Sequence, residues 1–166
     1  MVNHFNPFYV KIYLILIGKT SVQPVADAMN DYLKRVERYG RFEVKVLPEL
    51  RNTKSMPVEV QLQKEAEMLL PLIESYQEVI LLDEKGRELS SEEFAGFIQK
   101  KQNSGLRDMA FVVGGPYGFS ESVKSAATER LSLSRMTFSH QLVRLVFMEQ
   151  LYRAFTIING EPYHHA

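Results

Sequence analysis

The 166-residue sequence contains no cysteine. This absence excludes disulfides and thiolate metal sites, and it is typical of proteins kept in a reducing compartment. It also excludes one reaction, because methylation at C5 of a pyrimidine commonly begins with attack by a cysteine thiolate. A base methylated by this protein would therefore accept the methyl group at a heteroatom, unless another nucleophile takes part.

Long hydrophobic runs are also missing. The apolar stretch 10–17 is interrupted by Lys11 and is too short to span a bilayer. No basic segment of the kind found in secretory signals precedes it. We therefore expect a cytoplasmic protein with no membrane association, folded as one domain over residues 1–166.

The chain carries no net charge, with 20 basic and 20 acidic residues, so the total gives no support to a nucleic-acid partner. The distribution is more informative, because the only acids after residue 130 are Glu149 and Glu161. The basic residues of the same segment are Arg130, Arg135, His140, Arg144, Arg153, His164 and His165. A local basic face is expected there, and a dimer would double it.

Apolar strand-like runs alternate with helical segments along the chain. Strands are expected at 10–17, 42–47, 78–82, 109–113 and 131–133, and helices at 22–39, 58–76, 92–101, 121–129 and 139–155. This order predicts an α/β sandwich with a largely parallel sheet. Ser90 and Glu93 form a capping-box pattern at one helix start. The last helix is apolar on more than one face, which predicts burial against a second subunit.

A glycine turn, 114–118 with the sequence Gly-Gly-Pro-Tyr-Gly, follows an apolar strand and precedes a helix whose N-cap is Ser120. Ligands of parallel sheets bind at the carboxyl ends of strands, and glycine allows the backbone to approach them closely. The spacing is not G-x-G-x-x-G, and the sequence has no P-loop motif. Taken alone, the turn fits either a ligand loop or a simple tight turn.

A hydroxyl-rich segment, 131–139, alternates serine and threonine with Leu133, Met136 and Phe138. Its backbone could hydrogen-bond to an adenine edge while the apolar side chains cover the ring. An edge strand that leads into a helix N-cap would have the same composition. Both interpretations remain open from the residues alone.

Two pairs with helical spacing follow. His140 and Arg144 are four residues apart, and so are Glu149 and Arg153, in the order that favours an ion pair. His140 fits either a substrate contact or a helix-start residue that caps the backbone, and the Glu149–Arg153 pair fits a purely structural role as well.

Aromatic and imidazole side chains near the end of the chain, at Tyr152, Tyr163 and His164, could stack on an extruded base or belong to an interface. If the acceptor is a uracil-like N3–H, a base such as His164, His140 or Glu149 must remove its proton. Arg144 or Arg153 could stabilise the resulting charge or hold phosphate. The sequence does not choose among these residues.

Together, the glycine turn, the segment 131–144, the Glu149–Arg153 segment and the terminal Pro-Tyr-His-His resemble the RlmH family of large-subunit rRNA pseudouridine methyltransferases. This family belongs to the SPOUT superfamily of knotted S-adenosylmethionine enzymes. The resemblance starts near Val10, so residues 1–9 are expected to be an N-terminal extension. It departs from the family pattern at the end of the chain, where His165 and Ala166 follow His164.

The resemblance implies a C-terminal trefoil knot, which pattern reasoning alone would reject because knots are rare. It also implies methylation of N3 of a pseudouridine on assembled ribosomes, with no metal. The carried-over cofactor positions are Leu82, Gly114, Leu133, Ser134, Arg135, Met136, Thr137 and Phe138, and the candidate catalytic residues are His140, Arg144, Arg153 and His164. In the implied homodimer, the C-terminal tail of one subunit completes the pocket of the other.

Two other functions remain as alternatives. One is a different SPOUT methyltransferase that acts on tRNA or on a ribose 2′-hydroxyl, which the identity of the acceptor would distinguish. The other is a non-catalytic ribosome-binding module that keeps the fold. Binding of S-adenosylmethionine would count against the second alternative.

Overall fold

The structure, a computed structural model, describes residues 10–165. The expected N-terminal extension 1–9 and Ala166 lie outside the described residues. The elements, in chain order, are β1 (Lys11–Ile17), α1 (Gln23–Val36), β2 (Phe42–Leu47), α2 (Val58–Ile73), β3 (Glu78–Glu88), α3 (Ser91–Asn103), β4 (Asp108–Val113), α4 (Glu121–Ala126), β5 (Glu129–Ser132) and α5 (Leu142–Ile158).

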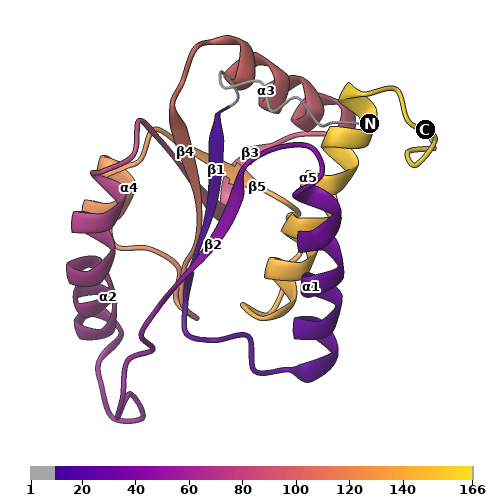
Figure 1. Cartoon of the computed structure of the whole chain (residues 1–166). Helices are drawn as coiled ribbons and strands as arrows, with labels where there is room; N and C mark the ends of the chain where they lie inside the picture. The colour runs from indigo at the N-terminus through magenta and orange to yellow at the C-terminus, as the bar shows by residue number, and fades with distance from the viewer. Residues whose placement is uncertain (1–9, 166) are drawn as a thin grey trace.

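The five strands form one sheet in the order β2-β1-β4-β3-β5, and every pairing is parallel. The predicted α/β architecture is confirmed. Because the strands are parallel, their carboxyl ends meet at one edge of the sheet, which lies at the bottom of Figure 1. The loops that follow β3, β4 and β5 therefore converge at this edge.

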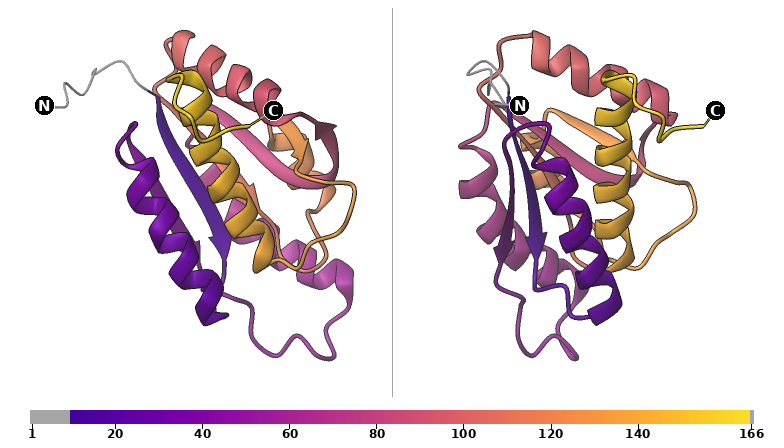
Figure 2. Two further views of the ribbon diagram at one scale, coloured as in Figure 1. Left: turned by 90° about the vertical axis from the view of Figure 1, so that its right-hand side faces the viewer. Right: turned by 45° about the vertical axis from the view of Figure 1, so that its right-hand side comes forward.

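Helices cover both faces of the sheet. Helices α1, α3 and α5 pack on one face, and α2 and α4 pack on the other (Figures 1 and 2). The central strands β1 and β4 read as nearly continuous apolar runs because a strand buried on both faces has no solvent side.

Several boundaries differ from the expectation, and contacts far along the chain explain two of these differences. The helix predicted for 121–129 ends at Ala126, and Glu129 already belongs to β5. The reason is Thr128, whose side chain accepts a hydrogen bond from Val79 N (3.0 Å) and whose N–H donates to Val79 O (2.8 Å). Because of these bonds the helix ends about one turn before the predicted end, and the chain joins the sheet at Glu129.

Strand β3 runs to Glu88, six residues beyond the predicted end at Leu82. Its register against β5 shifts between Leu82 and Arg87. A Cβ at Gly86 would stand 2.7 Å from the backbone nitrogen of Leu131, so only glycine permits the close crossing of the two strands. The polar sequence of this stretch resembles a turn, which is why the pattern missed the extension.

The predicted capping box of α3 is confirmed: Ser90 Oγ accepts from Glu93 N (3.1 Å), and Glu93 Oε2 accepts from Ser90 N (2.7 Å). Helix α5 covers Leu142–Ile158 instead of 139–155. No helix within residues 10–165 is both long and apolar enough to cross a bilayer. The trefoil knot stays a prediction.

Candidate functional site

A pocket with a volume of about 330 Å³ opens at the carboxyl ends of β3, β4 and β5. This volume lies in the range of small-molecule sites. Three loops build the pocket, and seven of the eight predicted cofactor positions line it: Leu82, Gly114, Leu133, Ser134, Met136, Thr137 and Phe138. Segments that are up to 56 residues apart in the sequence (Leu82 to Phe138) thus meet in one place.

The glycine turn after β4 forms one wall of this pocket. Gly118 has a positive φ of 78° and donates from its N–H to Gly115 O (3.1 Å). A Cβ at Gly114 would stand 2.8 Å from Gly118 O and 3.1 Å from the ring of Phe119. Glycine at position 114 is therefore required by the shape of the turn, and this residue lines the pocket without a side chain.

Behind the same turn lies Glu65 of α2, which is 4% exposed and which the sequence analysis did not single out. A Cβ at Gly115 would stand 2.9 Å from Glu65 Cδ, so the carboxyl group fills the space that a side chain at 115 would need. A signal was available in the sequence. Gln61 and Glu65 share the four-residue spacing of the buried Leu69 and Ile73, which places them on the apolar stripe of the helix.

Burial raises the pKa of the Glu65 carboxyl above its ordinary value of 4.5, and Gln61 offsets part of this effect. The folded protein therefore binds the proton more tightly than the unfolded chain, so stability falls as the pH rises from 4.5 toward the folded pKa. We expect Glu65→Gln to unfold at higher urea concentration than the wild type at pH 7, with the difference closing near pH 4.5. Glu67→Gln, on the exposed side of α2, is the control. A constant difference at every pH would contradict this account.

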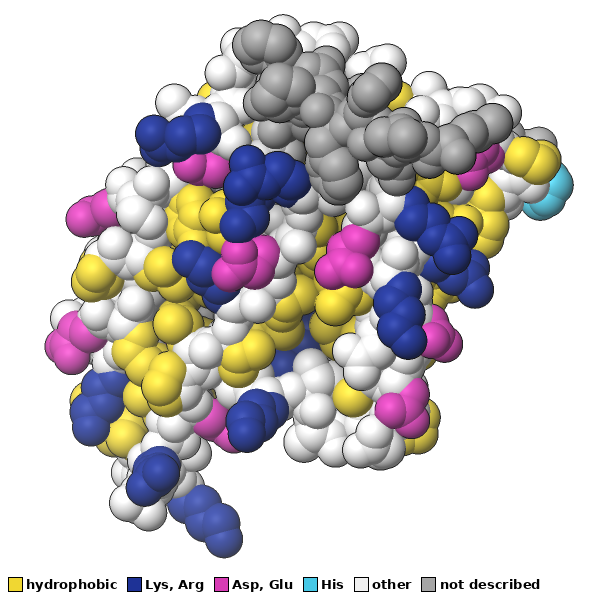
Figure 3. All heavy atoms as spheres, viewed as in Figure 1, with side chains coloured by type: hydrophobic (Ala, Val, Ile, Leu, Met, Phe, Trp, Pro, Cys, Tyr) yellow, Lys and Arg dark blue, Asp and Glu magenta, His cyan; other side chains and the backbone are white. Residues whose placement is uncertain are grey.

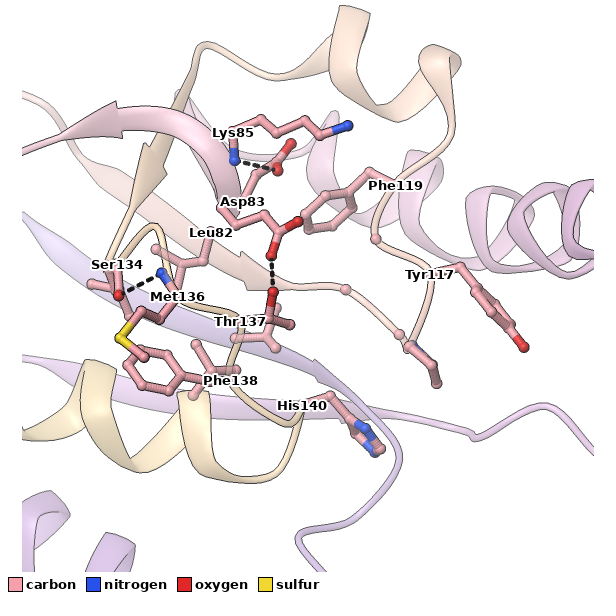
Figure 4. Close-up of a pocket in the computed structure, with 18 of the residues that line it drawn as sticks. Leu82, Asp83, Lys85, Tyr117, Phe119, Ser134, Met136, Thr137, Phe138 and His140 are labelled. Carbon is pink, nitrogen blue, oxygen red and sulfur yellow. Dashed lines mark hydrogen bonds between the residues drawn. The ribbon is translucent and has the colours of Figure 1, made fainter.

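The loop after β5 is shaped by its own hydroxyl groups. Ser132 Oγ donates to Ser134 O (2.9 Å), and Ser134 Oγ accepts from Met136 N (2.9 Å). Thr137 Oγ1 donates to Glu84 Oε2 (2.6 Å), which joins this loop to the loop after β3 (Figure 4). These bonds leave the backbone of the loop and the side chains of Leu133 and Phe138 to form the pocket wall.

Arg135 is the one predicted cofactor residue that does not line the pocket. Its side chain is 85% exposed, and its Nε lies 3.4 Å from Glu88 Oε1. Only its backbone remains a candidate for a ligand contact.

His140, one of the candidate catalytic residues, lines the pocket, and Tyr117 stands with it on the side opposite Ser134 and Met136 (Figure 4). His140 lies just before α5 and does not cap it. The N-cap residue is Gln141, and Ser139 Oγ accepts from Leu142 N (3.1 Å) at the start of the helix. The imidazole is thus available at the pocket, where an acceptor would enter.

Arg144 does not have the predicted substrate contact. Its side chain is fully buried, and its guanidinium donates to Ile17 O (2.8 Å), Gly18 O (2.9 Å) and Thr20 Oγ1 (3.0 Å) and to His140 O (3.0 Å). Burial lowers the pKa of the Arg144 guanidinium, and the nearby charge of Glu49 offsets part of this effect. With its donors used inside the protein, Arg144 joins the end of β1 to the start of α5.

We expect Arg144→Met to lower the free energy of unfolding by about 3 kcal/mol, because the carbonyl groups of residues 17 and 18 lose their partner in a buried place. Urea unfolding at a fixed protein concentration measures this loss. Arg135→Met removes the same charge from the surface and should change stability by less than about 0.5 kcal/mol. Equal changes in the free energy of unfolding for the two variants would show that Arg144 does not stabilise the fold.

Arg153 and His164 form a second cluster, near the carboxyl end of α5. Arg153 donates from Nε to Glu149 Oε1 (3.0 Å), and its Nη1 lies 3.2 Å from His164 Nδ1. The His164 Nε2 atom lies 2.8 Å from Glu92 Oε1. Tyr163 donates to Glu149 Oε1 (3.1 Å), and burial is the main cause that raises its pKa, so its phenol stays a neutral donor.

This second cluster lies away from the pocket of the same chain. Val143 lines the pocket and Arg153 follows ten residues later on α5, so a rise of ~1.5 Å per residue separates them by about 15 Å along the helix axis. A proton transfer needs about 3 Å between heavy atoms. The structure thus brings the predicted catalytic residues together in two groups instead of one. No group of three or more metal-ligating side chains occurs in the described part of the chain.

Known proteins similar to this chain share nearly its whole length. Residues 10–164 match the family described as Predicted SPOUT methyltransferase. The chain is 49% identical to Ribosomal RNA large subunit methyltransferase H of Porphyromonas gingivalis and 47% identical to that of Bacteroides thetaiotaomicron. Each alignment covers 94% of this chain and 99% of the relative.

Solved structures with the same fold include a probable methyltransferase from Bordetella pertussis, with a TM-score of 0.56 and 12% identity over 90% of this chain and 98% of that one. A tRNA (m1G37) methyltransferase from Aquifex aeolicus also has a TM-score of 0.56, with 16% identity over 95% of this chain and 75% of that one. At these identities the likeness concerns the fold alone.

Proposed function

Because the chain belongs to the SPOUT methyltransferase family, we propose that it transfers the methyl group of S-adenosylmethionine to N3 of a pseudouridine in large-subunit rRNA, acting in the cytoplasm on assembled ribosomes. The observation that carries the proposal is the convergence of three loops in one pocket. Its apolar side chains, Leu82, Leu133 and Phe138, suit the faces of an adenine, and the backbone that lines the pocket at Gly114 and 133–138 suits its polar edge.

The residues of this chain would mainly position the reactants. S-adenosylmethionine supplies an activated methyl group on a sulfonium, which an in-line nucleophile displaces directly. An N3–H acceptor must lose its proton as the N–C bond forms. His140 stands at the pocket, and His164 and Glu149 stand in the second cluster, so these three are the candidate bases, with Arg153 as the candidate cation that stabilises the anion.

A homodimer would unite the two groups of residues. The tail of one protomer lies about 15 Å from its own pocket along α5. A twofold axis beside α5 would bring each tail to the partner's pocket, because the same surface patch is used on both subunits. Leu142, which is 41% exposed, and Val146, which is half-buried, leave an apolar strip on the outer face of α5 for such an interface.

The test is transfer of labelled methyl from S-adenosylmethionine to ribosomes that lack the modification, with mass spectrometry of the product nucleoside. We expect 3-methylpseudouridine in large-subunit rRNA. A methyl group on tRNA or on a ribose hydroxyl would replace the proposed acceptor, and tight cofactor binding without any transfer would favour a ribosome-binding module.

A further inference from the structure

Four of the exposed lysines and arginines that lack an ion pair lie in the loops at one end of the molecule. None of the ion pairs within residues 10–165 involves Lys19, Arg51, Lys54 or Lys85, and all four side chains are exposed. Figure 3 shows lysine and arginine side chains at the lower left, over the loop between β2 and α2. This end is the carboxyl edge of the sheet, where the pocket opens.

The sheet places these cations on both sides of the pocket. Lys85 lines the pocket itself, after β3. Lys19 follows β1, and Arg51 and Lys54 follow β2, on the other side of β4. With strands spaced by about 4.8 Å, the end of β2 lies only two strand positions, or about 10 Å, from the end of β4.

The loop that carries Arg51 and Lys54 has a defined shape. Met56 N donates to Thr53 O (3.1 Å), Asn52 has a positive φ of 56°, and Pro57 is the N-cap of α2. Leu50, Thr53 and Met56 are half-buried, whereas Arg51 and Lys54 are exposed between them. The loop therefore presents its two cations to solvent beside the pocket.

The carboxylate that could neutralise this loop is directed elsewhere. Glu49 lies against Gly18, because a Cβ there would meet Glu49 Oε2 at 3.4 Å, and its charge acts on the buried Arg144. On the other side of the pocket, Asp83 is paired with Arg130 and Glu84 accepts from Thr137. The acids near the pocket thus hold the fold, and the four cations remain free.

We infer that Lys19, Arg51, Lys54 and Lys85 form a phosphate-binding rim that docks the rRNA backbone around the methyl-donor pocket. The inference rests on the proposed function and adds the surface that the substrate contacts. RNA fits this surface because an acceptor base that reaches the pocket leaves its flanking phosphates outside it, on the side where these cations lie. The neutral total charge of the chain is no obstacle, since phosphate contacts are local.

The test compares Lys54→Glu with Lys100→Glu, which changes a lysine on α3 that is also exposed and has no ion pair among the described residues, and with the double variant Arg51→Glu/Lys54→Glu. We expect Lys54→Glu to raise the KM for undermethylated ribosomes by at least about threefold and to lower the slope of log affinity against log salt by about 0.7. The double variant should roughly double the slope change. Lys100→Glu should match the wild type, and calorimetry should give all three the wild-type affinity for S-adenosylmethionine.

Binding to protein-free large-subunit rRNA separates the possible partners. Loss of affinity for both ribosomes and free rRNA supports the rim. Loss for ribosomes alone would assign the surface to a ribosomal protein and overturn the inference, as would wild-type KM and salt slope in the double variant. If the wild type itself transfers no methyl group to rRNA, the proposed function fails and the rim fails with it.

Discussion

Gly114→Val is expected to weaken the binding of S-adenosylmethionine by roughly 100-fold while the protein stays folded. The valine Cβ would meet Gly118 O at 2.8 Å and the Phe119 ring at 3.1 Å, so either the turn opens or the side chain enters the pocket. Overpacking of this kind costs about 3 kcal/mol, which corresponds to roughly 100-fold in Kd. Titration calorimetry measures the loss.

The matched control is Gly96→Val, because a Cβ at this position on α3 would meet nothing within 4 Å. Gly96→Val should bind the cofactor like the wild type, and both variants should keep the circular dichroism of the native fold. Wild-type affinity in a folded Gly114→Val protein would place the donor site elsewhere.

Deletion of the tail, residues 162–166, is expected to abolish methyl transfer without weakening cofactor binding. Tyr163 and His164 do not line the pocket that holds the cofactor in our proposal, but they contribute the phenol and imidazole of the second cluster. Loss of a proton acceptor or an orienting group from a reaction site reduces the turnover rate by a factor of about 10² to 10⁴.

Mixed dimers decide which pocket the tail serves. A protomer with Gly114→Val still has a tail, and a protomer without residues 162–166 still has a donor pocket. If the tail acts on the partner, random mixing of these two inactive proteins should restore about a quarter of the wild-type activity, because about half of the dimers then hold one complete site. No recovery in verified mixed dimers would mean that the tail serves its own chain or none.

The order of elements could be predicted from the sequence because it rests on local patterns. Alternating apolar runs gave the parallel sheet, and the Ser90–Glu93 pair marked the start of α3. The end of α4 could not be predicted in this way. It depends on Thr128 bonding to Val79, a residue 49 positions away that no local pattern reveals.

The candidate site shows the same limit. The resemblance named loops that do meet in one pocket, and the candidate catalytic residue His140 lines that pocket. Arg144 was misjudged because an arginine one helical turn after a histidine looks like part of the same site, and only the fold places the Ile17 and Gly18 carbonyl groups around it. Glu65 was missed because acids on a helix are usually exposed, although its spacing from Leu69 and Ile73 indicated the buried side.

The contact between Arg144 and the end of β1 joins residues that are 126 and 127 positions apart, close to the two ends of the chain. During synthesis, β1 emerges before α5, and the carbonyl groups of Ile17 and Gly18 lack the Arg144 partner until α5 has been made. A nascent chain that stops before α5 would therefore expose both these groups and the apolar surface that α5 covers. An enzyme whose proposed substrate is the ribosome thus completes its own fold only after the ribosome that makes it has translated α5.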